Sequence, residues 1–232
     1  MNRRNDLIAE HGLWHYAVHS EKEIPKLRAE TWRAMEDAVK NGKVKAIGVC
    51  NFTIQHLEGL KKTATMWPPT VNQIECHPLF PQRELVDYCR KEGIIVQAYS
   101  SLGGQDVGKK FWRTLYPPSK KRRKNSPAPV TKLSDTPPVL ALAAETNRTS
   151  AQVLLRWGLE NNFSLVPKTS SKERMIENSD ILDFSLSAAQ MERLEKELQS
   201  VLADAAKREN KKVESMARLC WRKDPLRDLD FE

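Results

Sequence analysis

The sequence predicts an α/β fold in which parallel strands alternate with helices, as in an incomplete (β/α)8 barrel of the TIM type. From residue 31 onward, short apolar runs alternate with segments of helical period. The apolar runs are continuous, as in strands buried on both faces of a parallel sheet. The 232 residues are 40% hydrophobic and can build a core, although such barrels usually need about 250 residues. The absence of a GxGxxG motif disfavours a Rossmann fold.

The predicted elements follow one another along the chain. Thr31 is predicted to cap a first helix that ends near Gly42. Capping patterns at Thr53, Ser170 and Ser187 predict the starts of three further helices. Helix is also predicted at 84–92 and over 139–161, there with a turn near 147–149. Strands are predicted at 44–49, 70–76, 94–99 and 163–166.

One segment breaks this order and holds most of the net charge. Residues 104–138 contain nine basic and two acidic residues, a net charge of +7, whereas the whole chain carries +8. The segment is also rich in Pro and Ser and shows no sustained hydrophobic period. Such a composition buries too little apolar surface to offset chain entropy, so we predict a disordered insertion without a core.

Polar side chains stand at four predicted strand ends, which are the functional end of a βα barrel. Asn51 and Gln73 carry amides that can hold a carboxamide, and Tyr99 offers an aromatic face to a flat ring. Lys168, with Arg174 one helical turn further on, offers two cations beside a helix amino terminus, where a phosphate binds well. Each group alone is also explained as a helix cap or a satisfied loop residue, but together they form one coherent nucleotide site.

Five motifs, in the same order, resemble the aldo-keto reductase family: residues 48–52 (GVCNF), 71–78 (VNQIECHP), 97–103 (QAYSSLG), 151–157 (AQVLLRW) and 166–178 (VPKTSSKERMIEN). The resemblance covers residues 31–102 and 138–198. It implies a monomeric (β/α)8 barrel that binds NADPH in an extended form and reduces small aldehydes or ketones. A cytoplasmic location is expected because the four cysteines form no CxxC pair and no secretory leader is recognised. The chain is then one domain, residues 1–232, with a poorly matched segment at 1–30 and a charged tail at 203–232.

The resemblance also implies which residues contact the cofactor. Asn51 and Gln73 would hold the nicotinamide carboxamide, and Tyr99 would stack on the ring. Cys50 stands where the family usually has Ser, which weakens one hydrogen bond there. Ser100 and Leu102 would line the path of the pyrophosphate. The adenosine 2′-phosphate would be bound by Lys168, Thr169, Ser170, Ser171 and Arg174. Glu177 and Asn178 would hold the adenine.

The family's catalytic tetrad of Asp, Tyr, Lys and His is matched much less well. Its Tyr is the general acid, with a pKa lowered by the Lys–Asp pair. No residue of this chain corresponds to the Asp, Tyr or Lys, and His19, three residues after Tyr16, is the candidate for the His. We therefore expect impaired catalysis. The alternative is a non-catalytic protein that binds a cofactor, or a partner through the basic insertion.

Two other features suggest further functions. His11, His15 and His19 would share one helix face, but no carboxylate completes a set of metal ligands, so we predict no metal. The basic run from Lys120 to Lys124 resembles a nuclear import signal and leaves a nuclear location open. It lacks interleaved aromatic residues, so we do not expect nucleic-acid binding. No apolar stretch approaches the length of a membrane helix, so we expect no membrane association.

Overall fold

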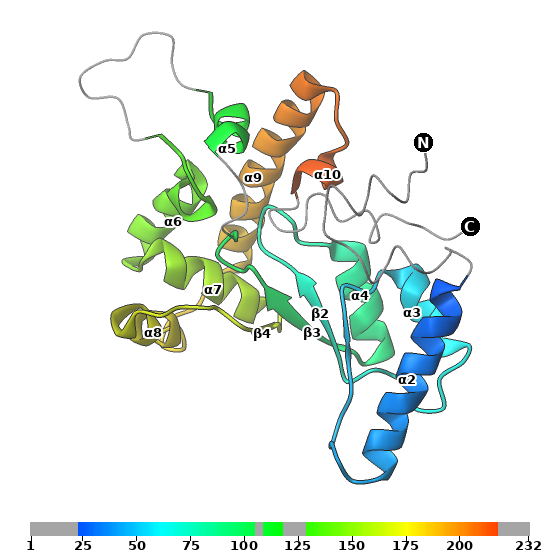
Figure 1. The fold of residues 1–232 in the computed structure, drawn as a ribbon. Helices are drawn as coiled ribbons and strands as arrows, with labels where there is room; N and C mark the ends of the chain where they lie inside the picture. The colour runs from blue at the N-terminus through cyan, green and yellow to red at the C-terminus, as the bar shows by residue number, and fades with distance from the viewer. Residues whose placement is uncertain (1–22, 105–108, 118–128, 218–232) are drawn as a thin grey trace, which may run out of the picture.

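A computed structural model describes residues 23–104, 109–117 and 129–217 (Figure 1). At its centre lies a four-stranded sheet in the order β1-β2-β3-β4, and every neighbouring pair is parallel. The strands are β1 (Val49–Cys50), β2 (Val71–Glu75), β3 (Ile95–Tyr99) and β4 (Ser164–Leu165). Strands of consecutive number lie side by side with helices between them, which confirms the predicted α/β class and the partial barrel.

Helices join and surround the strands. Figure 1 shows α2, α3 and α4 near the β1 end of the sheet and α6, α7 and α8 near the β4 end. The helices are α2 (Ile24–Lys40), α3 (Ile54–Lys61), α4 (Arg83–Glu92), α5 (Lys109–Leu115), α6 (Pro137–Thr146), α7 (Ser150–Glu160), α8 (Lys172–Ser179), α9 (Ala188–Glu209) and α10 (Val213–Ala217), with a 3-10 turn η1 (Leu133–Asp135).

The two faces of the sheet differ in burial. Ile74, Val96 and Ala98 are buried on the face that the helices cover. Ile95 and Gln97 point to the opposite face because side chains alternate along a strand, and Ile95 is 52% exposed. Within the described residues, the face that would line the inside of a barrel is therefore the more open one.

Local capping signals in the sequence predict several helix ends correctly. Thr53 and Ser187 each accept a hydrogen bond from the third residue of their helix, His56 and Gln190, and the reciprocal bond completes both capping boxes. Gly93 adopts the left-handed conformation (φ 74°) that ends α4.

Three predicted boundaries are wrong. Thr31 lies inside α2, where its hydroxyl donates to Leu27 O at 2.8 Å, because the helix already begins at Ile24. The cap of α8 is Ser171, which accepts from Arg174 N, and not Ser170. The strand predicted at 44–49 shrinks to two residues because only Val49 and Cys50 pair with β2.

The prediction that residues 104–138 lack a core is wrong for the part that the structure describes. α5 buries Phe111, Trp112 and Leu115, and η1 buries Leu133. The physical reason is a partner distant in sequence: α5 packs against the second half of α9, which extends to Glu209. The whole Lys120–Lys124 run falls outside the described residues, as do the rest of 118–128 and residues 105–108.

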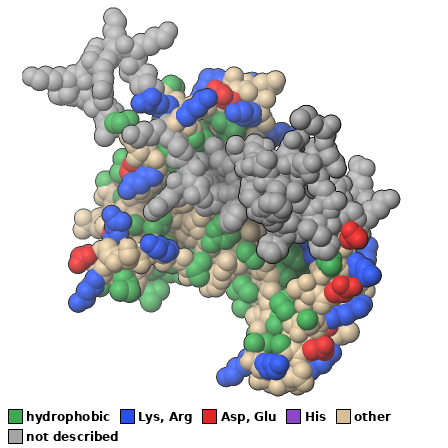
Figure 2. Space-filling model, in the orientation of Figure 1, with side chains coloured by type: hydrophobic (Ala, Val, Ile, Leu, Met, Phe, Trp, Pro, Cys, Tyr) green, Lys and Arg blue, Asp and Glu red, His purple; other side chains and the backbone are tan. Residues whose placement is uncertain are grey.

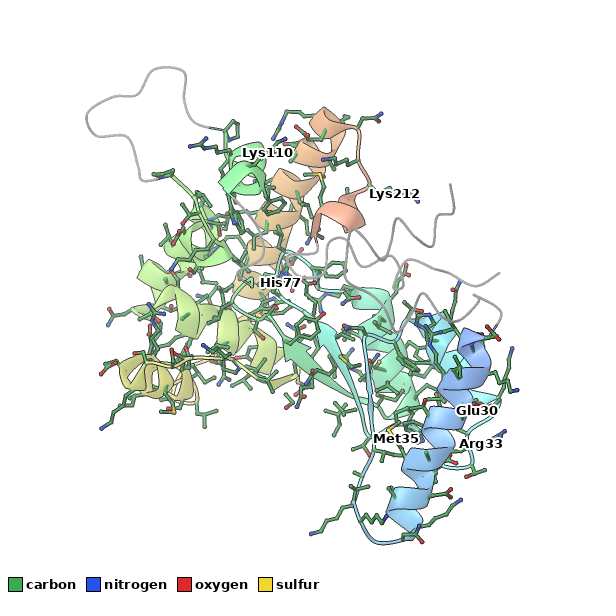
Figure 3. The ribbon with its side chains drawn as sticks, in the orientation of Figure 1. Glu30, Arg33, Met35, His77, Lys110 and Lys212 are labelled. Atoms are coloured by element: carbon green, nitrogen blue, oxygen red, sulfur yellow. The ribbon has the colours of Figure 1, made fainter. Side chains whose placement is uncertain are left out.

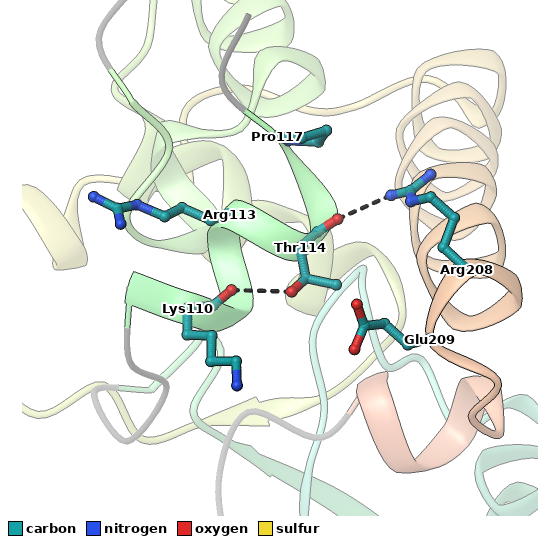
Figure 4. A pocket seen from close by; sticks show the side chains of 6 residues that line it. All are labelled: Lys110, Arg113, Thr114, Pro117, Arg208 and Glu209. Atoms are coloured by element: carbon teal, nitrogen blue, oxygen red, sulfur yellow. Dashed lines mark hydrogen bonds between the residues drawn. The ribbon is translucent and has the colours of Figure 1, made fainter. Parts of the chain in front are cut away.

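A direct hydrogen bond reinforces the contact between α5 and α9. Arg208 Nη2 on α9 donates to the carbonyl oxygen of Thr114 at 2.9 Å (Figure 4). Nearer the middle of α9, Gln199 Nε2 donates to the carbonyl oxygens of Pro78 and Leu79, at 3.2 and 2.9 Å. These bonds tie α9 both to the predicted insertion and to the turn that follows β2.

Candidate cofactor site at the carboxyl ends of the strands

The predicted site residues gather at one end of the sheet. Asn51 follows β1 directly, Tyr99 is the last residue of β3, and Lys168 lies three residues beyond β4. Gln73 lies inside β2, paired in register with Cys50. Because all four strands are parallel, their carboxyl ends lie at the same edge, which is the functional end of this architecture.

Asn51, Gln73 and Tyr99 are linked by hydrogen bonds. The backbone N–H of Asn51 donates to the backbone carbonyl oxygen of Gln73 at 2.8 Å, and the Tyr99 hydroxyl donates to Asn51 Oδ1 at 2.9 Å. Asn51 has a left-handed backbone (φ 57°), a conformation that asparagine tolerates better than most residues. An amide side chain and an aromatic ring from two non-adjacent strands therefore meet at this edge.

Asn72 holds this arrangement from the other face of the sheet. It is fully buried. Its side chain accepts from Phe52 N at 3.3 Å and donates to Phe52 O at 2.9 Å. The pair of bonds fixes the chain just after Asn51. The sequence analysis assigned no role to Asn72; its position next to Gln73 in a predicted strand was the available signal.

Cys50 contacts Gln73 only weakly. Its Sγ lies 3.9 Å from Gln73 Oε1, at the long end for a sulfur donor. A thiol is a weak hydrogen-bond donor. This position therefore contributes less polarity to the site than the Ser expected from the resemblance.

The loop from β4 to α8 forms a second polar group. Thr169 Oγ1 accepts from Ser171 N at 3.1 Å, and Ser171 caps α8. Lys168 and Arg174 are exposed beside this helix start, where the backbone N–H groups and the helix dipole favour an anion. One carboxylate opposes this: the Ser171 hydroxyl donates to Glu173 at 2.6 Å and holds the pKa of that carboxyl below its usual value.

The remaining predicted cofactor residues lie just after β3 or on α8. Ser100 has a left-handed backbone (φ 54°) and accepts from Gly103 N at 2.7 Å. Leu102 packs against the core. Glu177 and Asn178 are half-buried on α8. His19, the proposed catalytic histidine, lies outside the described residues together with His11 and His15.

A buried pair at the end of β2 was missed by the sequence reasoning. Glu75 and His77 are both fully buried, and Glu75 Oε1 lies 3.2 Å from His77 Nε2. His77 Nδ1 accepts from Phe80 N at 3.1 Å, so Nε2 carries the proton that faces the carboxylate. Figure 3 shows His77 near the centre of the molecule, beside α9. Two ionisable residues separated by one residue at the end of a predicted strand were the available signal.

Two cavities lie away from this edge. One of about 550 Å³, between α5 and the end of α9, is lined by Lys110, Arg113, Thr114, Pro117, Arg208 and Glu209 (Figure 4). Figure 2 shows Lys and Arg side chains gathered in this upper region. A second cavity, of about 760 Å³, is lined by residues of α2 and α3. Neither is lined by a predicted cofactor residue, so the candidate site is an open edge of the sheet and not one of these hollows.

The described residues contain no cluster of three or more His, Cys, Asp or Glu side chains that could hold a metal ion. No helix among them combines the length and the apolar character that a membrane crossing requires.

The aldo/keto reductase family model matches residues 10–199. This chain belongs to the aldo-keto reductase family. The match begins upstream of the first predicted motif and runs through residues 104–138. Glyoxal reductase of Bacillus subtilis is 38% identical over 167 residues, which cover 72% of this chain and 50% of that protein. Aldo-keto reductase family 1 member A1 of Xenopus tropicalis is 35% identical, covering 70% and 45%.

Solved structures of the family share the fold. An aldo-keto reductase complexed with NADPH is 36% identical, with a TM-score of 0.57 over 72% of this chain and 46% of its own. The aldose reductase of Schistosoma japonicum is 32% identical, with a TM-score of 0.59 over 73% and 46%. The chain thus spans about half the length of the curated relatives that it matches.

Proposed function

We propose that this chain supplies the cofactor-binding part of an NADPH-dependent aldo-keto reductase that acts on small aldehydes or ketones. The proposal rests on one observation above all. Asn51, Gln73 and Tyr99 adjoin at the carboxyl ends of neighbouring parallel strands, and Lys168 follows the last strand of the same sheet. An NADPH complex among the related structures supports the choice of cofactor.

Each part of the site has a matching part of the cofactor. The amides of Asn51 and Gln73 would pair with the carboxamide, and the Tyr99 ring would stack on the nicotinamide, a type of contact that contributes about 1 kcal/mol. Lys168, Arg174 and the start of α8 would bind the 2′-phosphate, because two cations and a helix amino terminus converge there. That phosphate is the group that distinguishes NADPH from NADH.

Removing the two cations should weaken NADPH binding and leave NADH binding unchanged. For the double substitution Lys168→Met and Arg174→Met we expect a rise of about tenfold in the dissociation constant of NADPH, because exposed charge pairs each contribute about 0.2–1 kcal/mol. Isothermal titration calorimetry with both dinucleotides would measure this. Lys196→Met, at an exposed position on α9, is the matched control. An equal loss for NADH would contradict the assignment.

Restoring serine at position 50 should tighten binding. Cys50→Ser replaces a weak donor 3.9 Å from Gln73 with a stronger one, so we expect an affinity for NADPH about threefold higher, equivalent to one modest hydrogen bond. Cys50→Ala, which has no donor, should show no gain. A gain of the same size in both variants would point to relief of steric crowding and away from a hydrogen bond.

A further inference from the structure

Four side chains form a row across the exposed face of the sheet. Cys50, Gln73, Gln97 and Ser164 are paired in register on neighbouring strands, one from each strand. Partners in register point to the same face, so all four lie on the face opposite the main helix-covered core. None of them is charged, and the row runs from the predicted carboxamide site to the edge strand β4.

The hydrogen bonds in this row have a direction. Gln97 Nε2 donates to Ser164 Oγ at 3.3 Å. This bond turns the oxygen of the Gln97 amide toward β2, where Oε1 accepts from Gln73 Nε2. Gln73 therefore turns its nitrogen toward β3 and its oxygen toward β1, where Cys50 Sγ lies 3.9 Å away. Because Gln97 presents its oxygen to Gln73, the oxygen end of the Gln73 amide faces the β1 side.

We propose that Gln97 is a positioning residue that holds the Gln73 carbonyl oxygen toward the bound nicotinamide, so that the site selects a primary amide on that ring. The inference rests on the proposed function, because it concerns the same site. A carboxamide NH₂ is a donor, and it requires acceptors. Gln73 Oε1 is one, and Asn51 Oδ1, which also accepts from Tyr99, is the other. If the Gln73 amide were reversed, its NH₂ group would face the NH₂ group of the carboxamide, and two donors would meet.

A purely structural role for the row makes a different prediction. Cross-strand polar pairs stabilise sheets without any ligand, and Gln97 is half-buried. If the row only held β2, β3 and β4 together, loss of Gln97 would weaken all dinucleotides alike through a less ordered site. If it positions Gln73, the loss depends on whether the ligand carries the NH₂ group.

Two variants and two ligands separate these roles. Gln97→Met keeps the size of the side chain but cannot accept from Gln73, whereas Gln97→Glu keeps the acceptor. NADP⁺ carries the carboxamide, and its 3-acetylpyridine analogue replaces the NH₂ with a methyl group. Binding of each ligand to each 232-residue variant would be measured by isothermal titration calorimetry. Gln55→Met, at an exposed position on α3, is the control.

For Gln97→Met we expect NADP⁺ to bind about tenfold more weakly and the analogue to change by less than about twofold, since an unmatched polar group costs about 1–3 kcal/mol. Gln97→Glu should recover most of the affinity for NADP⁺. Equal losses for both ligands, or no loss for either, would overturn the inference. If the unaltered chain bound neither ligand, the proposed function itself would fail, which is a different result from unaltered binding that is insensitive to Gln97.

Discussion

Replacing Glu36 with alanine should lower the free energy of unfolding by about 1–3 kcal/mol, the range for leaving hydrogen-bond donors without their acceptor. Glu36 lies on α2 and is only 1% exposed. Its carboxylate accepts from Thr65 N at 2.7 Å, Thr65 Oγ1 at 2.8 Å and Met66 N at 2.7 Å. These are the donors of the loop between α3 and β2. The substitution leaves two backbone N–H groups and a hydroxyl without their acceptor, which costs more than the lost bonds alone.

Urea denaturation at neutral pH would measure the loss. The matched control is Glu30→Ala on the same helix, where the side chain is 51% exposed and lies 3.9 Å from Lys26. We expect that control to change stability by less than about 0.5 kcal/mol. A loss as small for Glu36 as for Glu30 would show that the loop finds other acceptors and that the buried carboxylate is dispensable.

The same carboxylate should give a defined pH dependence. Burial by itself raises the pKa of Glu36, but the hydrogen bonds from Met66 and Thr65 outweigh it and hold the pKa below its ordinary value. A lowered folded-state pKa means that the stabilisation is fully present above the unfolded-state pKa of about 4.3 and is lost as the pH falls through the folded-state pKa. The stability difference between the wild-type chain and Glu36→Gln should therefore shrink as the pH falls below about 4.

Local signals in the sequence were sufficient for most of the fold. The strands were found because apolar runs end in polar residues, and the caps at Thr53 and Ser187 were found because a capping box involves residues only three apart. The same locality explains the error at Thr31. A threonine before an apolar face resembles a cap, and only the helix start at Ile24 shows that its hydroxyl bonds back to Leu27 instead.

Contacts between residues that are far apart in the chain could not be predicted from the sequence. Composition alone predicted disorder for residues 104–138, yet α5 packs against α9 and Trp112 on α5 is buried. Phe111, Trp112 and Leu115 have helical spacing, but the pattern is too short to predict a helix within such a highly charged segment. In the candidate site, Asn51 and Gln73 were named from their motifs, but the row through Gln97 to Ser164 depends on the register of three strands.

The 232-residue chain should show no turnover of carbonyl substrates even where it binds NADPH. Hydride transfer to a carbonyl produces an alkoxide that must be protonated as it forms, and general acid catalysis of such a step contributes about 10²–10⁴ in rate. The acid must have a pKa close to the working pH. A tyrosine serves only where its surroundings lower its pKa, as the family's Lys–Asp pair is expected to do.

None of the three described tyrosines stands out as such an acid. Burial, followed by the hydrogen bond to the Glu58 carboxylate at 2.5 Å, raises the pKa of Tyr88. Burial likewise raises the pKa of Tyr116 to about 12. The hydroxyl of Tyr99 donates a hydrogen bond to Asn51 Oδ1, and we propose that its ring stacks on the nicotinamide. A raised pKa makes a phenol a weaker acid at neutral pH, so each of the first two is a poorer donor than free tyrosine.

Loss of NADPH absorbance with a panel of aldehydes and quinones would test this, alongside glyoxal reductase of Bacillus subtilis as a positive control. Calorimetry on the same sample separates a failure to bind from a failure to protonate. Binding without turnover supports the alternative of a non-catalytic cofactor-binding protein. Turnover that survives Tyr99→Phe but is lost with Tyr16→Phe would make Tyr16, which lies outside the described residues, the acid. Turnover indifferent to every tyrosine would mean that the family's proton donor has been replaced by a different chemical group.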